Sequence, residues 1–299
     1  MNPMTSNPIK PRFALIGERE TCYCRHADTD LIRTTLEINP EHQRVTTEQF
    51  EEILERPGRE TKPSIDKQAT LYFLSDDFGP RSLFCKPERA RRCRLATSRR
   101  VENFVLDQDG NVIFSTPRGT LYVIDARGER QLCKPEPGRR LLAVAPDGQT
   151  VYTIRGREVH AIRNGESSLL HKLRSRQTIE DGGLDPSGRF LFLWSNDRMW
   201  RIDLETGQIE QRQLPADELD FSFTAVLSKN YLLARATEGQ DVMDPERGDD
   251  IIYKEVAVHS VFDIERGEHL DSHALNEDWL VTRFTPTRGA VEPRGSGPR

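Results

Sequence analysis

Two short segments place cysteine, histidine and aspartate at alternate positions, which makes them the first candidates for metal binding. They are TCYCRH, with Cys22, Cys24 and His26, and HLDSH, with His269, Asp271 and His273. On a β-strand, alternate side chains share one face, but each step of two residues separates them by about 6.5–7 Å. All ligands of a zinc ion must instead lie about 2.0–2.3 Å from the metal. The spacing therefore favours ordinary strand residues, and we expect no metal or other cofactor.

The densest basic segment, CKPERARRCRLATSRR, runs from residue 85 to residue 100. Its cationic residues are Lys86, Arg89, Arg91, Arg92, Arg94, Arg99 and Arg100. Such a segment could bind an anionic protein or a nucleic acid. However, it contains no aromatic residue that could stack on a base, and the whole chain carries a formal charge of −5. The alternative is a solvated segment whose cations pair with neighbouring carboxylates.

An acidic segment, ATEGQDVMDPERGDDIIYKEV, runs from residue 236 to residue 256. Its candidates for partner binding are Asp241, Asp244, Glu246, Asp249 and Asp250. The segment lacks the regular Asp-x-Asp-x-Asp spacing, with a glycine and a final glutamate, that is typical of a calcium loop. Long insertions on rigid scaffolds often carry function. The two favoured interpretations are a partner-binding element and a tolerated insertion.

Local catalytic motifs are absent from the sequence. It contains no Gly-x-Ser-x-Gly elbow, no phosphate-binding loop and no His-Glu-x-x-His. Asp181 and Asp185, in EDGGLDP, could line the mouth of a channel, but a role in a turn is the favoured interpretation. We therefore predict no catalytic residue from local spacing.

The elements that would position these segments follow a repeat of about 40 residues. VLDQDGNVIFST, VAPDGQTVYTI and LDPSGRFLFLW each contain an apolar strand, a tight turn and a second apolar strand. The turn glycines are Gly110, Gly148 and Gly188, and Asn230 takes that place in a fourth copy, where asparagine would tolerate positive φ. A third strand and a more polar fourth strand follow each pair. Four strands per repeat predict β-propeller blades, which bury one another's faces.

Two of these repeats resemble the bacterial YVTN or WD40-like propeller repeat. They are VAPDGQTVYTI and LDPSGRFLFLWSNDRMWRIDLETGQI, in which a Pro-Asp-Gly-like turn precedes a Tyr-Val-like strand and an Ile-Asp-x-x-x-Gly strand end. The resemblance covers roughly residues 100–285 and implies a propeller fold, without the Gly-His and Trp-Asp dipeptides of eukaryotic-type repeats. Propellers serve many unrelated roles, so the resemblance alone implies no activity. It does raise the alternative of a lactonase-like hydrolase with a site at the central channel.

We predict an all-β chain with one propeller domain over residues 13–287. The clear repeats cover 101–136, 139–173, 179–214 and 221–275. Six four-stranded blades are expected, with five or seven as alternatives. Strands from both ends of the chain would share the last blade, because that arrangement leaves no open sheet edge.

Three further segments lie outside the repeats. TTEQFEEILERPG predicts one short helix near residues 46–56, begun by a threonine cap and ended by Pro57-Gly58. Residues 1–12 are expected to form a loose N-terminus and residues 288–299 a disordered tail.

The strings TLYFLSDDFGPRSLFCKPE and TLYVIDARGERQLCKPE share both their beginnings and their ends. In the preferred alignment, each supplies the third and fourth strands of a blade. Cys85 and Cys133 then occupy equivalent outer positions, and the basic segment is an added loop. In the competing alignment, the basic segment supplies the fourth strand of the earlier blade.

Together these features predict a non-catalytic propeller that acts as a protein–protein interaction platform through its basic and acidic segments. No apolar run is long enough for a membrane span or a signal-peptide core, so we expect a cytoplasmic location and no membrane partner. The five cysteines are an odd, sparse set that suits reduced thiols. The alternatives are the lactonase-like hydrolase and a binder of an anionic partner or nucleic acid through residues 86–100.

Overall fold

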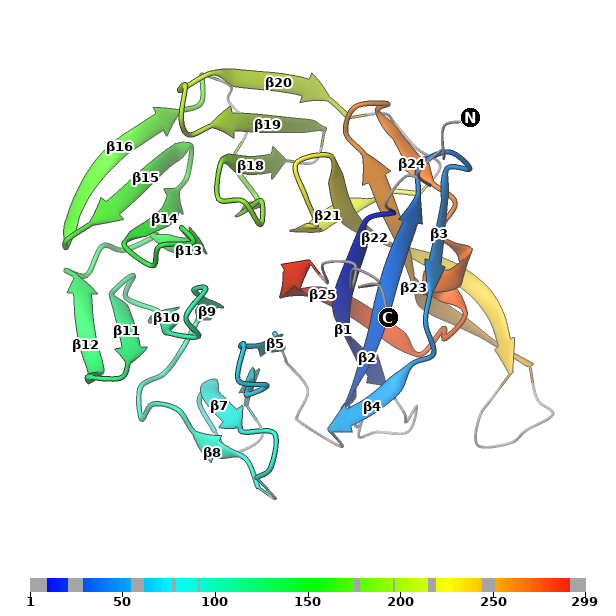
Figure 1. Cartoon of the computed structure of the whole chain (residues 1–299), viewed down its shortest axis with the longest axis horizontal. Coiled ribbons are helices and arrows are strands. Elements are labelled where there is room, and N and C mark those ends of the chain that lie inside the picture. Colours follow the sequence, from blue (N-terminus) through cyan, green and yellow to red (C-terminus); the bar gives the residue numbers. More distant parts are fainter. Residues whose placement is uncertain are drawn as a thin grey trace, which may run out of the picture.

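A computed structural model describes most of the chain as strands arranged in a ring. The described residues are 10–20, 29–54, 62–76, 79–90, 92–174, 178–195, 197–214, 219–243 and 251–290. Among them there is one 3₁₀ turn, η1 (His273–Asn276), and no α-helix, so none could cross a membrane. Six sheets stand around a central axis (Figure 1). The chain is therefore a six-bladed β-propeller, as the repeat predicted.

Five of the blades consist of four consecutive antiparallel strands. The first two are β5 (Ser64–Ile65), β6 (Leu71–Ser75), β7 (Ser82–Lys86) and β8 (Arg94–Leu95), then β9 (Asn103–Leu106), β10 (Val112–Ser115), β11 (Leu121–Asp125) and β12 (Gly128–Cys133). The next two are β13 (Arg140–Val144), β14 (Thr150–Arg155), β15 (Glu158–Arg163) and β16 (Glu166–Lys172), then β17 (Asp181–Leu184), β18 (Phe190–Ser195), β19 (Arg198–Asp203) and β20 (Ile209–Gln213). The fifth is β21 (Ser222–Val226), β22 (Tyr231–Met243), β23 (Ile251–Asp263) and β24 (Glu268–Leu270). The first strand of each blade lies nearest the axis (Figure 1).

The sixth blade joins the two ends of the chain. Its strands are β25 (Val281–Ala290), β1 (Arg12–Glu20), β2 (Thr29–Asn39), β3 (Arg44–Thr47) and β4 (Glu51–Leu54). β25 pairs with β1, with Gly17 opposite Phe284, and both β3 and β4 pair with β2. The predicted closure by strands from both chain ends is confirmed, and the inner strand of this blade comes from the C-terminal part.

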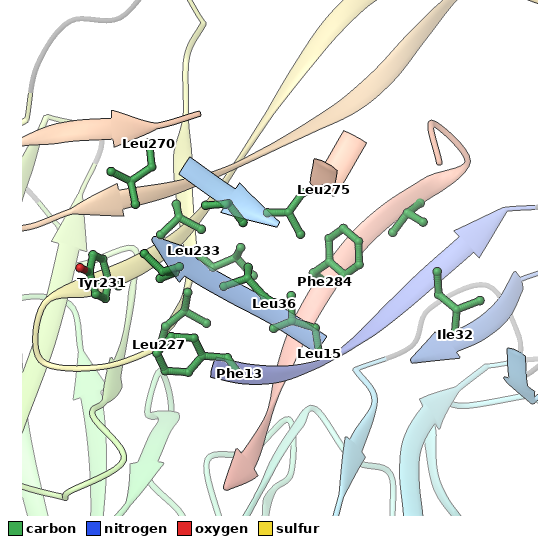
Figure 2. Close-up of a cluster of buried hydrophobic side chains, with 14 residues drawn as sticks. Phe13, Leu15, Ile32, Leu36, Leu227, Tyr231, Leu233, Leu270, Leu275 and Phe284 are labelled. Atoms are coloured by element: carbon green, nitrogen blue, oxygen red, sulfur yellow. The ribbon is translucent and has the colours of Figure 1, made fainter. Parts of the chain in front are cut away.

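A buried apolar cluster attaches the closing blade to the blade before it. Phe284, Leu15 and Leu36 from the closing blade pack with Leu233 and Leu270 (Figure 2). A Cβ added at Gly17 would lie 2.8 Å from Ile32 Cγ1 and 3.1 Å from Phe284, so glycine makes room for both side chains. The ring is closed by hydrophobic packing as well as by strand pairing.

The predicted helix near residues 46–56 is wrong. In the described part of that range, β3 ends at Thr47 and β4 covers Glu51–Leu54. Phe50 packs on the closing cluster and stacks on Phe284 at 6.3 Å, whereas Ile53 and Leu54 pack on a second cluster. β4 pairs with β2, and the apolar side chains of this segment are buried in two different clusters. These long-range contacts outweigh intrinsic helix propensity, which is only a weak determinant of structure.

The preferred alignment of the two TLY strings is also wrong. The first string supplies β6 and β7, the second and third strands of its blade, whereas the later string supplies β11 and β12. Cys85 therefore lies on a third strand and Cys133 on a fourth. The competing alignment is correct, because β8, inside the basic segment, completes the earlier blade.

The turns after the inner strands use glycine as expected. Gly110, Gly148 and Gly188 have φ angles of 84°, 68° and 78°. The expectation for Asn230 is wrong, because the described non-glycine residues with positive φ are Gln43, Ala69 and Asn164. In that turn the backbone N–H of Asn230 donates a hydrogen bond to Ser228 Oγ, with an N–O distance of 3.2 Å.

Several predictions fall on residues outside the described ranges. They are the Cys22, Cys24 and His26 set, most of the loose N-terminus, and residues 291–299 of the expected tail. The tail was predicted to begin at residue 288, and β25 continues to Ala290.

Candidate functional site

The basic segment lies on the outer rim of the ring. It covers the end of β7, a connecting loop and β8, which is the outermost strand of its blade. Arg89, Arg92 and Arg94 are exposed there, beside a Leu95 side chain that is 56% exposed. Lys86 is half-buried and Arg100 is exposed, whereas Arg91 falls outside the described residues. Arg89, Arg92 and Arg94 thus share the rim, whereas Arg100 lines a pocket with Arg81 and Glu102.

One cation of this segment has a structural role. Arg99 Nε donates to Glu129 Oε1 at 2.5 Å, and its guanidinium lies 4.2 Å from the centre of the Tyr122 ring. Thr97 donates to the other oxygen of the same carboxylate at 2.5 Å. Since Glu129 belongs to the following blade, Arg99 links two blades. This is the pairing with a neighbouring carboxylate that the solvated-segment interpretation predicted for the cations of the segment.

The acidic segment continues the second and third strands of its blade beyond the first strand. Ser222, at the start of β21, pairs with Arg235, and β22 then runs on to Met243 with β23 returning from Ile251. We call residues 237–243 and 251–257 the arm. It leaves the ring on the side where the inner strands begin and extends beyond the other strands of its blade (Figure 1). Asp241 lies on the arm, and the acidic positions 244, 246, 249 and 250 fall outside the described residues.

One face of the arm carries exposed apolar side chains. Met243 pairs directly with Ile251, and Asp241 pairs with Tyr253, so all four side chains share that face. Met243, Ile251 and Tyr253 are 61%, 71% and 75% exposed. A Cβ at Gly239 would lie 1.8 Å from Tyr253 Oη, so the tyrosine lies across the glycine. The arm therefore presents exposed apolar side chains with Asp241 on the same face.

The mouth at which the inner strands end contains a cavity of about 420 Å³, which we call the turn mouth. Asp66, Asp107 and Asp185 line it, each directly after an inner strand. Each carboxylate accepts a hydrogen bond from a backbone amide of its own turn, from Thr70 at 2.8 Å, Asn111 at 2.9 Å and Phe190 at 2.7 Å, respectively. These carboxylates hold the turns, which agrees with the favoured interpretation of Asp185.

The candidate acids of the sequence do not converge. Asp181 begins β17 and Asp185 follows its last residue, so the two lie at opposite mouths of the channel. His269 Nδ1 lies 3.0 Å from Ser260 Oγ on the neighbouring strand, whereas His273 begins η1. Within the described ranges, no group of three or more His, Cys, Asp or Glu side chains is arranged to hold a metal.

This architecture places the chain in the class of six-bladed β-propellers, and solved structures of that fold resemble it. No family model matches the chain, and no curated protein matches it by sequence. A protein assigned as TolB from Agrobacterium tumefaciens aligns with a TM-score of 0.55 and 11% identity over 87% of this chain and 88% of its own. TolB from Acinetobacter baumannii gives 0.59 and 13% over 93% and 66%, and a nidogen/laminin complex gives 0.53 and 11% over 92% and 97%. Identities this low show a shared fold only.

The exposed apolar residues of the arm, Met243, Ile251 and Tyr253, were not among the predicted site residues. The sequence had drawn attention to the acids of this insertion. A stronger signal was the run IIYKEVAV at residues 251–258, which is rich in β-branched and aromatic residues and is typical of a strand.

Proposed function

We propose that this chain is a non-catalytic β-propeller that binds another protein through the apolar face of its arm. The observation that carries the proposal is the exposure of Met243, Ile251 and Tyr253 on a hairpin that projects from a rigid ring. Clustered exposed apolar side chains of this kind mark interaction surfaces, and aromatic residues and methionine are enriched in them. The ring supports the arm, and the arm makes the contact.

The charge around the arm indicates the chemistry of the partner. Asp241 shares the apolar face, and the sequence adds four more acidic residues between the two strands of the hairpin. The partner should therefore present an apolar pocket bordered by lysine or arginine, because complementary charge at the rim steers association. The nidogen/laminin structure supports the idea only in general terms, as a propeller fold present in a complex of two proteins.

The alternatives have less support. A hydrolase would need carboxylates that are free to act on a substrate, whereas Asp66, Asp107 and Asp185 hold their own turns. Contact with an anionic partner or nucleic acid through the basic segment stays a prediction, as does a cytoplasmic location, which cell fractionation would test. We also propose a YVTN/WD40-like origin for the blades, supported by the Pro-Asp-Gly-type turns.

An affinity capture with matched variants tests the arm. The arm variant replaces Met243, Ile251 and Tyr253 by serine, and the control variant makes the same change at Leu169 and Leu170, which are exposed on β16. We expect one protein to be captured by the wild type and the control but lost with the arm variant. That protein should also bind the purified propeller in a salt-sensitive manner.

Two results would contradict the proposal. Identical captures by the wild type and the arm variant would show that the arm makes no contact. Loss of the partner with Arg89→Glu and Arg92→Glu, but not with the arm variant, would move the contact to the basic segment. Self-association removed by the arm variant would identify a second copy of this chain as the partner.

A further inference from the structure

The mouth of the channel at which the inner strands begin collects cationic side chains. Arg140 is the first residue of β13, and Arg283 is the third residue of β25. Lys62 lies two residues before β5. Arg235 lies on β22 opposite Ser222, the first residue of β21. Because the inner strands form one ring, all four cations lie around the same opening, which we call the cationic mouth.

Hydrogen bonds that cross from blade to blade fix these side chains. Lys62 Nζ donates to Asn103 Oδ1 at 3.3 Å, and Asn103 Nδ2 donates to the Leu141 carbonyl at 3.1 Å. Arg140 donates at 2.7 Å to the carbonyls of residues 179 and 180 in the next blade.

The same pattern continues at the closing blade. Arg235 Nε donates to the Thr282 carbonyl at 2.7 Å, and Thr282 Oγ1 donates to the Glu18 carbonyl at 3.1 Å. The Thr282–Glu18 bond lies within the closing blade, and each of the other bonds links one blade to its neighbour. The scaffold therefore holds Lys62, Arg140 and Arg235 in place before any ligand arrives. Such preorganisation lowers the entropic cost of binding.

Carboxylates lie at this mouth beside the cations. Asp181 and Glu18 attract Lys62, which Arg283 and Arg140 repel, and Glu18 and Glu20 attract Arg235. Glu20 acts on Lys254 as well as on Arg235. Burial, followed by the nearby Arg283, lowers the pKa of Arg235 below its ordinary value.

Burial and neighbouring positive charges also act on Lys62. Burial lowers the pKa of Lys62, and the positive charges of Arg283 and Arg140 lower it further, against the opposing effect of Asp181 and Glu18. Cations that repel one another in a partly desolvated ring are stabilised by an anion that enters it.

We propose that the cationic mouth binds a small dianion that carries a phosphate group or two carboxylates. Arg140, Arg235 and Arg283 offer planar donor pairs suited to both groups. Lys62 and Arg235 are half-buried within the ring of inner strands, which favours a compact ligand. This site is separate from the apolar face of the arm, although both lie on the side where the inner strands begin.

Calorimetric titration tests the site directly. Inorganic phosphate and succinate are titrated into the whole chain at a constant ionic strength set with sodium chloride. Binding of either dianion is expected. The variant Lys62→Gln with Arg283→Gln should weaken it by about tenfold or more, since the loss of a single charge-assisted hydrogen bond already weakens binding by about that factor. The control Arg89→Gln with Arg92→Gln, on the outer rim, should bind as the wild type does.

A second readout uses the wild-type chain and therefore does not require a folded variant. Lysine acetylation by a water-soluble reagent, followed by mass spectrometry, should show Lys62 protected by the bound dianion, whereas the exposed Lys172 stays equally reactive. Binding no tighter than that of chloride, equal loss in the rim control, or acetylation of Lys62 unaffected by both dianions would each overturn the proposal.

Discussion

Met243 and Ile251 are direct cross-strand partners at the end of the arm, and both of their side chains lie in solvent. Cross-strand apolar pairs in a folded sheet usually cover one another and part of a core. This pair instead extends an apolar face that continues to Tyr253. The arm thus exposes apolar surface area that does not contribute to the core of the propeller.

We expect the arm face to contribute little to stability. Met243→Ser with Ile251→Ser should change the free energy of unfolding by no more than about 0.5 kcal/mol each, since surface substitutions rarely exceed that value. Leu233→Ala, on the same strand but fully buried, should cost about 2–5 kcal/mol. Urea unfolding measures both changes. Equal losses would show that the arm residues belong to a core.

The closing blade should depend on Phe284. This side chain is buried among residues from both chain ends and from the preceding blade. Phe284→Ala should lower the free energy of unfolding by about 3–5 kcal/mol, because it leaves a cavity at the junction that closes the ring. Thermal and urea unfolding measure the loss. A cost near that of Leu169→Ala, an exposed position, would contradict this role.

A buried arginine should matter more than an exposed one in the same region. Arg139 is buried, donates to the Lys134 carbonyl at 3.0 Å and to Cys133 Sγ at 2.8 Å, and forms an ion pair with Glu136. Arg139→Met removes the donor to Lys134 and Cys133, while Glu136 keeps its ion pair with Arg155, and it should cost about 1–3 kcal/mol. Arg130→Met, which removes an exposed pair with Asp125, should cost at most about 1 kcal/mol. Chemical unfolding of both variants would refute the assignment if the order were reversed.

Acid should destabilise the fold through His259. Burial, and then the charge of Arg235, lowers the pKa of His259 to about 3 from an ordinary 6.5. Between those values the unfolded chain binds a proton that the native chain does not. Stability is therefore lost as pH falls below about 6.5, by up to about 1.4 kcal/mol per unit. His259→Phe should flatten the dependence between pH 6.5 and 4.5, a window above the ordinary carboxylate range.

Urea unfolding at several pH values within that window measures the slope. As pH falls, the wild type should lose stability more steeply than His259→Phe does. Above pH 7 the difference between their slopes should vanish. Parallel slopes for the two proteins would mean that His259 is protonated in the native state.

The propeller was predictable because the blade signal is local. A turn glycine after an apolar strand, as at Gly148 and Gly188, recurs at a steady interval, and each copy needs its neighbours to bury its faces. Positions that depend on distant partners were predicted less well. Glu51–Leu54 forms a strand because β2 lies beside it, and β8 is recognisable only once it pairs with β7.

The candidate sites were predictable only in part. The insertion that became the arm was visible, but the exposure of Tyr253 depends on what the folded ring leaves uncovered. The cationic mouth brings together Lys62, Arg140 and Arg283 from three separate blades. No local motif can show such a cluster.

Photo-cross-linking from the arm in the native host tests the central claim most directly. A photoreactive phenylalanine analogue replaces Tyr253 in one protein and Leu169, also exposed, in a matched control. We predict one specific cross-linked protein from position 253, absent from position 169 and lost when Met243 and Ile251 are changed to serine. No product at position 253, or the same products at both positions, would contradict a protein-binding role for the arm.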